Sequence, residues 1–309
     1  MSKHALRSIV LHNTIQSFRQ LRKSLPSTST IGYVPTMGAL HDGHLSLVDR
    51  ARKENDIVVS SIFVNPTQFG KNEDLGKYPR QLEKDVEMLA ARGADHVFIP
   101  DVDMMYGKHH VAYIDPTGFD DIPEGKSRPG HFRGVATIVT KLFNIVQPTR
   151  AYFGQKDAAQ CVLIQRIVED LNIPVEIVIM DTVREADGLA MSSRNAYLTE
   201  TERQCAPIIN KALRAAKEQW LETNIPESSS KVDMHKIPAK DLAATVRQVL
   251  NQESLVSEIY YVSVDSCQTM QPLSEVGSSG AVISLAVKVG SVRLIDNIVL
   301  NDIQQNGDI

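Results

Sequence analysis

The sequence predicts an α/β fold, in which helices cover both faces of a parallel sheet, with a smaller C-terminal α+β domain. Near the N-terminus a strand–helix–strand unit includes an almost wholly apolar strand, residues 57–64, as expected for burial on both faces. Apolar runs then alternate with segments of helical periodicity as far as Met180. A long helix and several strands, two of them joined as a hairpin, follow this region. We therefore expect domains at 1–189 and 190–309.

Composition narrows the class of protein. A chain of 309 residues fits about two domains. The net charge of −4 gives no global reason to expect nucleic acid as a partner, and no apolar run approaches the length of a membrane span. Cys161, Cys205 and Cys267 show neither zinc spacing nor a disulfide framework, which favours a reducing compartment and predicts a cytoplasmic protein.

The N-terminal residues allow two interpretations. Met1–Arg7 lacks the apolar core of a secretory signal. The basic and hydroxyl residues before Asp42 are compatible with a mitochondrial presequence. We prefer to assign Ser8–Leu25 to the folded domain, with a strand at Ile9–Leu11 and an amphipathic helix at Thr14–Lys23.

The rest of the first domain reads as alternating strands and helices. Short apolar runs predict strands at Ile31–Val34, Ile57–Val64, Val97–Ile99, Ala151–Phe153 and Val175–Met180. Apolar residues at helical spacing predict helices at Leu45–Glu54, Tyr78–Arg92, Val135–Val146 and Ala158–Leu171.

The second domain has a different pattern. Thr199 followed by Glu202 predicts a capping box that opens a long helix at Thr199–Leu221. The segment Thr223–Ala239 is rich in Ser, Pro and Lys and reads as an extended insertion. The other expected elements are a helix at Asp241–Leu250 and strands at Glu258–Val264, Ala281–Val289 and Val292–Ile295, the last two joined at Gly290–Ser291.

The ten residues Pro35–His44 connect an apolar strand to a helix and end in His-Asp-Gly-His. Their two glycines let a ligand approach the backbone, and the helix start offers unpaired N–H groups suited to phosphate. His41 and His44 are three residues apart, so both can face one ligand. A metal pair would need more ligands than the nearby Asp42 supplies, so we favour a phosphate site over a metal site or a solvated surface.

Further polar segments follow the other predicted strands. Asn65–Gln68 comes directly after the apolar strand at 57–64, and Gly154–Asp157 follows the strand at 151–153. Ligands of open α/β sheets bind at these carboxyl ends, so we expect the segments to share a rim with the two histidines. The sequence lacks a Walker loop, so the predicted phosphate site is of another type.

The segment Glu124–Gly134 is rich in glycine and basic residues. It contains Lys126, Arg128, His131 and Arg133 within eight residues. It is either a solvated basic loop or a mobile lid over an anionic substrate.

Six ordered strings resemble one family. His-x-Gly-His with a late Met-Ser loop is similar to the adenylyl-transferring superfamily that includes class I aminoacyl-tRNA synthetases. The longer strings resemble the pantothenate synthetase (pantoate–β-alanine ligase) family, and the resemblance covers nearly the whole chain. The strings are Pro35–His44, Phe63–Phe69, Arg128–Gly134, Phe153–Asp157, Gly188–Asn195 and Arg293–Asn297.

The resemblance implies a Rossmann-like domain that binds ATP and pantoate and a smaller C-terminal lid domain. Members of the family adenylate the carboxylate of (R)-pantoate with ATP and release diphosphate. The amine of β-alanine then attacks the pantoyl adenylate, which gives pantothenate and AMP. The resemblance also implies Mg²⁺ as a cofactor, a homodimer, and small-molecule partners only, namely (R)-pantoate, β-alanine and ATP.

The resemblance also implies roles for individual residues. Four residues are expected to be catalytic, namely His44, His41, Lys156 and Arg194, and His44 is expected to act as the general acid. ATP contacts fall to Met37, Gly38, Ala39, Leu40, His41, Asp42, Gly43, His44, Gly154, Gln155, Lys156, Asp157, Val183, Met191, Ser192, Ser193 and Arg194. Gln68 and Gln160 bind pantoate, Gln68 also borders β-alanine, and Asp85 serves Mg²⁺. Glu83 and Lys84 precede Asp85, where some members carry more acids, and the insertion at 223–239 is longer than usual in the family.

Three other functions share part of this pattern. A plain nucleotidyltransferase would share the histidines and the Met191–Arg194 loop but would not need neutral amides at Gln68 and Gln160 for a hydroxy acid. A non-catalytic nucleotide sensor would be expected to lack His44 or Lys156, and both are present. A transfer-RNA synthetase is disfavoured because the chain has no basic appended domain and a negative net charge.

Overall fold

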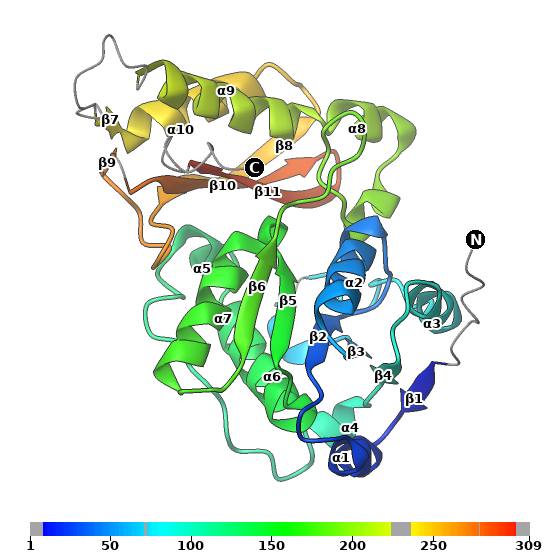
Figure 1. Cartoon of the computed structure of the whole chain (residues 1–309). Coiled ribbons are helices and arrows are strands. Elements are labelled where there is room, and N and C mark those ends of the chain that lie inside the picture. The colour runs from blue at the N-terminus through cyan, green and yellow to red at the C-terminus, as the bar shows by residue number, and fades with distance from the viewer. Residues whose placement is uncertain (1–8, 71–72, 224–235, 278, 301–309) are drawn as a thin grey trace. The chain divides into compact units, whose positions relative to one another are not determined.

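The computed structural model describes residues 9–70, 73–223, 236–277 and 279–300 (Figure 1). By its internal contacts the chain divides into two compact units. The first comprises residues 1–120, 128–155 and 163–183, and the second comprises residues 121–127, 156–162 and 184–309. The main part of the second unit begins at Arg184, whereas we expected the second domain to begin at residue 190.

The first unit contains a six-stranded sheet, and every pairing in it is parallel. The strands lie in the order β1-β4-β3-β2-β5-β6, which confirms the predicted parallel sheet. Their bounds are Val10–His12 for β1, Ile31–Thr36 for β2, Ile57–Ile62 for β3, His96–Phe98 for β4, Arg150–Gly154 for β5 and Glu176–Met180 for β6. The order changes direction between β2 and β5, which makes the carboxyl ends of these two strands the switch point where such sheets bind ligands.

Helices of the first unit cover both faces of this sheet. The helices α2 and α3 contact each other, as do α1 and α6, and the usual right-handed crossovers would place the first pair on one face and the second pair on the other. Figure 1 shows α2 and α6 on opposite sides of the strands. The bounds are Ile15–Ser24 for α1, Asp42–Glu54 for α2, Leu82–Ala91 for α3, Val102–Met105 for α4, His131–Val146 for α6 and Ala158–Asp170 for α7, which joins the first unit from Leu163 onward.

The second unit is built on a three-stranded antiparallel sheet in the order β11-β10-β8. The helices α9 and α10 pack on each other and on this sheet around the fully buried Trp220 and Leu242. This confirms the smaller α+β domain. The bounds are Pro123–Ser127 for α5, Glu200–Cys205 for α8, Ile208–Thr223 for α9, Ala239–Leu250 for α10, Ile237–Pro238 for β7, Val256–Asp265 for β8, Glu275–Val276 for β9, Ala281–Val289 for β10 and Val292–Leu300 for β11.

Three predicted elements differ from the structure. The single helix expected at 199–221 is two helices, because Pro207 lacks the N–H group that a continuous helix would need. The capping box of Thr199 and Glu202 is confirmed. The loop expected at 124–134 is mostly helical, since it contains most of α5 and the start of α6. The helix expected from Tyr78 begins at Leu82.

Two predictions concern residues outside the described ranges. Residues 1–8, which bear on the predictions about a secretory signal and a mitochondrial presequence, lie outside the described ranges. The strand and helix expected after them are confirmed as β1 and α1. Most of the insertion expected at 223–239 also lies outside, and the described part contributes the end of α9 and the short strand β7.

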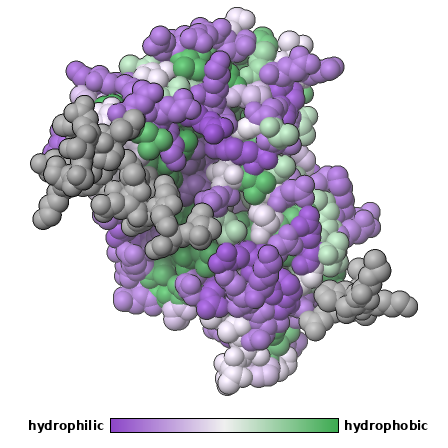
Figure 2. Space-filling model, turned by 45° about the horizontal axis from the view of Figure 1, so that its top comes forward, coloured by the Kyte–Doolittle hydropathy of each residue, from purple (hydrophilic) through white to green (hydrophobic). Residues whose placement is uncertain are grey.

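The surface is mainly polar on the face shown in Figure 2, where hydrophobic side chains are mixed among hydrophilic ones. Within the described ranges, no helix has both the length and the apolar character needed to cross a membrane.

Candidate active site

His41 and His44 form the start of α2 and bind its backbone. His41 is the N-cap, and its Nδ1 accepts the Gly43 N–H at 3.2 Å. Nδ1 of His44 accepts the His41 N–H at 3.4 Å, which completes a reciprocal capping box. The two rings lie 4.1 Å apart between centroids. Because each Nδ1 is an acceptor, each neutral ring carries its proton on Nε2, where it can be donated to a ligand oxygen.

The loop before this helix is held by the buried carboxylate of Asp85. Gly38 and Ala39 have positive φ angles of 81° and 52°. The two oxygens of Asp85 accept the N–H groups of Ala39 and Leu40, each at 2.9 Å, and Gln81 Nε2 donates to Oδ1 at 3.2 Å. The residue is only 1% exposed. Its carboxylate therefore fixes the path of the predicted ATP loop.

This geometry does not fit Asp85 as a magnesium ligand. Both of its oxygens are directed at backbone N–H groups rather than toward a cation. Among the residues that the structure describes, no group of three or more His, Cys, Asp or Glu side chains is placed to hold a metal. The magnesium role of Asp85 stays a prediction without support from its contacts, which give it a role in holding the loop.

Asp42 is also turned away from the two histidines. Its carboxylate is exposed and lies 3.3 Å from Arg92, which also pairs with Asp49. The contact of Asp42 with ATP stays a prediction.

Gln68 lies close to Met37, so the structure brings two predicted binding residues together. Gln68 Nε2 approaches the sulfur of Met37 at 3.3 Å. Asn65, which is 1% exposed, donates from Nδ2 to Gln68 Oε1 at 2.9 Å and caps the short helix η1 (Pro66–Gln68). In turn, Asn65 Oδ1 accepts the hydroxyl of Tyr106 at 2.8 Å. The amide of Gln68 is thereby oriented, because its oxygen accepts from Asn65 and its nitrogen directs one N–H at the Met37 sulfur.

Gly154 closes β5, directly beside β2 in the sheet. Gly154 and Gln155 belong to the first unit, as does Val183 after β6. Along the chain, Lys156 and Asp157 follow at once but cluster with the second unit. The first unit thus carries the histidine loop, Gln68 and the end of β5, all after carboxyl ends of parallel strands.

In the second unit, Lys156 is fixed through its backbone. Its carbonyl oxygen accepts Nδ2 of Asn297 at 2.9 Å. Its ammonium group lies 3.8 Å from Asp157, and its side chain is 19% exposed. Gln160 follows in the first turn of α7 and is half-buried. Burial raises the pKa of its neighbour Cys161, so that thiol is poorly suited to act as a nucleophile.

The Met191–Arg194 loop begins at a tight turn. The backbones of Arg184 and Ala190 form an isolated antiparallel β-bridge. The side-chain amide of Asn195 donates to the Ala190 carbonyl at 3.0 Å. Ser192 caps the short helix η3 (Ser193–Tyr197), and its hydroxyl oxygen accepts the Arg194 N–H at 3.2 Å. All four predicted residues of the loop are half-buried.

Two adjacent residues of β11 hold both of these segments. Asp296, 3% exposed, binds the guanidinium of Arg184 through both oxygens at 2.6 and 3.0 Å. Asn297, 4% exposed, holds Lys156. The sequence indicated the string Arg293–Asn297 only through its resemblance to the family, and it predicted no role for these two residues. The available signal was the pair of polar residues inside the apolar strand Val292–Leu300.

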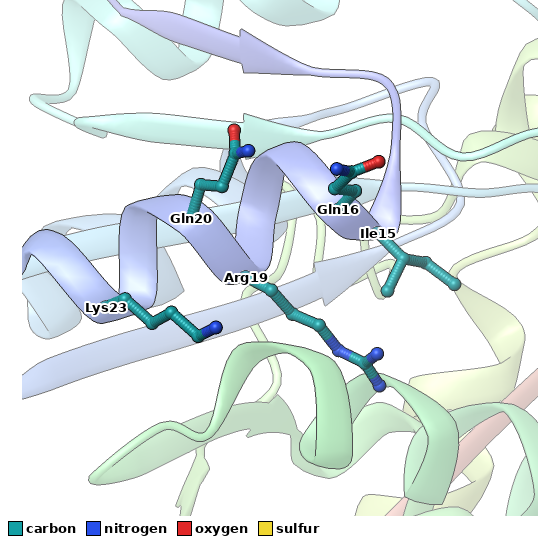
Figure 3. A pocket seen from close by; sticks show the side chains of 5 residues that line it. All are labelled: Ile15, Gln16, Arg19, Gln20 and Lys23. Carbon is teal, nitrogen blue, oxygen red and sulfur yellow. The ribbon is translucent and has the colours of Figure 1, made fainter.

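A surface hollow elsewhere carries none of the predicted site residues. It is lined by Ile15, Gln16, Arg19, Gln20 and Lys23, all from α1 (Figure 3). Gln16 and Gln20 extend to one side of the helix and Arg19 and Lys23 to the other. Because these side chains do not converge on a common point, the hollow is not a candidate active site.

Comparison with known proteins decides the family. Residues 10–299 match the family model described as pantoate-beta-alanine ligase. The chain belongs to this family. Pantothenate synthetase from Chloroflexus aggregans is 50% identical over 286 residues, which cover 93% of this chain and 99% of the relative. The Fervidobacterium nodosum pantothenate synthetase is 49% identical over 292 residues, covering 94% and 99%.

Solved structures of pantoate-beta-alanine ligases agree with the fold. Pantothenate synthetase from Thermus thermophilus is similar with a TM-score of 0.83 and 40% identity, covering 95% of this chain and 100% of that one. The ligase from Francisella tularensis, complexed with beta-gamma ATP and beta-alanine, has a TM-score of 0.74 and 36% identity, covering 94% and 98%. The predicted fold class and the predicted class of enzyme are therefore confirmed.

Proposed function

We propose that this pantoate-beta-alanine ligase works through a pantoyl adenylate and uses the two sets of residues described above. The observation that carries the proposal is the capping box of His41 and His44, in which Nδ1 of both rings accepts backbone N–H groups at the helix start that follows β2, at the switch point of the sheet. The Francisella tularensis relative, complexed with beta-gamma ATP and beta-alanine, supports ATP and β-alanine as substrates.

In the first step, a carboxylate oxygen of (R)-pantoate attacks the α-phosphorus of ATP. The bond from that phosphorus to the bridging oxygen breaks, and diphosphate leaves. We assign His41 and His44 to donate hydrogen bonds to phosphate oxygens, with His44 as the general acid. Lys156 and Arg194 supply positive charge where the negative charge of the transition state develops.

Gln68 and Gln160 bind pantoate in this proposal. The hydrogen bond from Asn65 to Oε1 orients the Gln68 amide, and we assign its second Nε2–H to a substrate oxygen. In the second step, the β-alanine nitrogen attacks the acyl carbon of the adenylate. The bond from that carbon to the phosphate oxygen breaks, AMP leaves, and the new amide nitrogen loses a proton.

Bound Mg²⁺ would neutralise part of the negative charge of the ATP phosphates. We assign it no protein ligand, because the Asp85 carboxylate is directed at the backbone. The homodimer stays a prediction from the family resemblance, and the cytoplasmic location stays a prediction from the cysteine pattern.

Analysis of the products tests the proposed reaction. With ATP, (R)-pantoate and β-alanine, mass spectrometry should find pantothenate, AMP and diphosphate in equal amounts. A plain nucleotidyltransferase would instead leave the AMP moiety attached to its acceptor. Such an adduct as the final product, with no pantothenate, would contradict the proposal.

A further inference from the structure

The backbone of Gln68 is held by three side chains that have no role in the reaction proposed above. Arg128 forms a two-pronged ion pair with Glu73, with N–O distances of 2.7 and 2.8 Å. Another nitrogen of the guanidinium lies 2.9 Å from Nε2 of His131. Nδ1 of His131 lies 2.8 Å from the carbonyl oxygen of Gln68. Nη2 of Arg128 also donates to the same carbonyl oxygen at 3.4 Å, so Glu73, Arg128 and His131 form one cluster around the Gln68 backbone.

The direction of each hydrogen bond follows from the donor inventory. A guanidinium can only donate, so Nε2 of His131 must accept, and the proton of the neutral ring lies on Nδ1. Nδ1–H therefore donates to the Gln68 carbonyl. The Arg128 side chain is 11% exposed and His131 is 6% exposed, so these bonds are largely shielded from water.

Packing makes this arrangement stiff. His131 is the first residue of α6, and Gly134 follows one turn later. A side chain on Gly134 would collide with the carbonyl of Thr67 and come within 2.7 Å of the Cα of Gln68. Asn65 also donates to the Gly134 carbonyl at 3.2 Å. The first turn of α6 thus lies directly against the backbone that presents Gln68.

We propose that Glu73, Arg128 and His131 are positioning residues that set the apparent affinity for pantoate by holding Gln68. The proposal rests on the proposed role of Gln68 as a pantoate ligand. It changes the interpretation of the basic segment at 124–134, because Arg128 and His131 bind groups of the protein itself. With Asn65 fixing the amide and His131 fixing the carbonyl, Gln68 is constrained at both ends.

Steady-state kinetics of three variants test the proposal. His131→Phe removes the shorter of the two hydrogen bonds to the Gln68 carbonyl. Arg128→Lys replaces the planar guanidinium, which donates to several partners at once, by an ammonium group, and Glu73→Gln weakens the ion pair. Each should raise the KM for pantoate, by roughly five- to fifty-fold for His131→Phe, because coupled neighbours commonly interact by about that factor. The KM for ATP should stay within about twofold. Arg133→Lys is the matched control, because Arg133 stacks on Tyr113 and should leave both constants unchanged.

A double-mutant cycle with Gln68→Ala separates this proposal from the proposed function. If Gln68→Ala leaves the pantoate KM unchanged, the pantoate role of Gln68 fails and the positioning role fails with it. If Gln68→Ala raises that KM but the three variants do not, only the positioning role is overturned. If Gln68→Ala and the three variants all raise the pantoate KM, the increase caused by His131→Phe should largely disappear when Gln68 is already replaced by Ala. An undiminished effect there would overturn the positioning role.

The two milder variants keep the test decisive if His131→Phe does not fold. Circular dichroism identifies the folded variants. The same cycle run with Arg128→Lys then gives the same two outcomes.

Discussion

The side-chain amide of Asn297 donates a hydrogen bond to the backbone carbonyl of Lys156 at 2.9 Å, across 141 residues of sequence. Asn297 is buried on β11, next to the aspartate that holds Arg184. The strand therefore fixes where the Lys156 backbone lies, and with it the base from which the ammonium group extends.

Asn297→Ala should slow adenylate formation while the protein stays folded. The Lys156 carbonyl would lose its partner, and a small displacement of the cation that we propose to act on the transition state would be costly. We expect a loss of about tenfold or more in the pre-steady-state rate of diphosphate release. Asn144→Ala removes a similar amide–carbonyl bond, from Asn144 to Thr140, on the exposed side of α6 and serves as the control. A wild-type rate in Asn297→Ala would contradict the positioning role.

Asp85→Asn tests whether this carboxylate holds the loop or binds metal. The amide would direct an N–H₂ group at the N–H of Ala39 or Leu40, which leaves a buried donor unpaired at a cost of about 1–3 kcal/mol. We expect a higher KM for ATP and a lower kcat, and these should not recover when the Mg²⁺ concentration is raised.

The exposed neighbour Glu83→Gln should behave as the wild type. If excess Mg²⁺ restored the activity of Asp85→Asn, the carboxylate would act on the metal and the loop-holding role would be wrong.

Much of the fold could be predicted because its signals are local. The strands of the first unit are short apolar runs followed by polar turns, and a parallel sheet with helices between its strands is the arrangement such a pattern allows. Where the pattern was ambiguous, the prediction failed. Basic residues and glycines at 124–134 indicated a loop, yet Arg128 and His131 satisfy their charges and donors inside the protein, which lets a helix begin at His131.

The sequence could predict candidate binding segments, but it could not predict the residues that hold these segments in place. Asp85 contacts the loop from 46 residues away, and Asp296 reaches Arg184 across 112 residues. No spacing rule connects such positions. Burial of a polar side chain is a property of the folded chain, and each of these carboxylates has a function only because a particular donor lies opposite it.

Asp265 makes stability depend on pH. It is 1% exposed at the end of β8 and accepts the Ser263 hydroxyl at 2.6 Å, and burial raises its pKa to about 7. The folded protein therefore holds this proton more tightly than the unfolded chain does. The resulting stability is fully present below the ordinary carboxyl pKa and is lost as the pH rises through about 7.

Asp265→Asn should consequently raise the free energy of unfolding at pH 8, by roughly 1 to 4 kcal/mol, and the difference should shrink toward pH 4. Urea denaturation at both pH values measures it, with the exposed Asp241→Asn as the control. An equal effect of Asp265→Asn at both pH values would show that the carboxyl does not titrate in this window.

Exchange of labelled diphosphate into ATP tests the central claim most directly, because it isolates formation of the adenylate. The wild-type ligase should catalyse this exchange with (R)-pantoate and Mg²⁺ in the absence of β-alanine. His44→Ala and Lys156→Ala should slow it by roughly 10²–10³ while both variants remain folded. Exchange that strictly requires β-alanine would contradict the two-step mechanism.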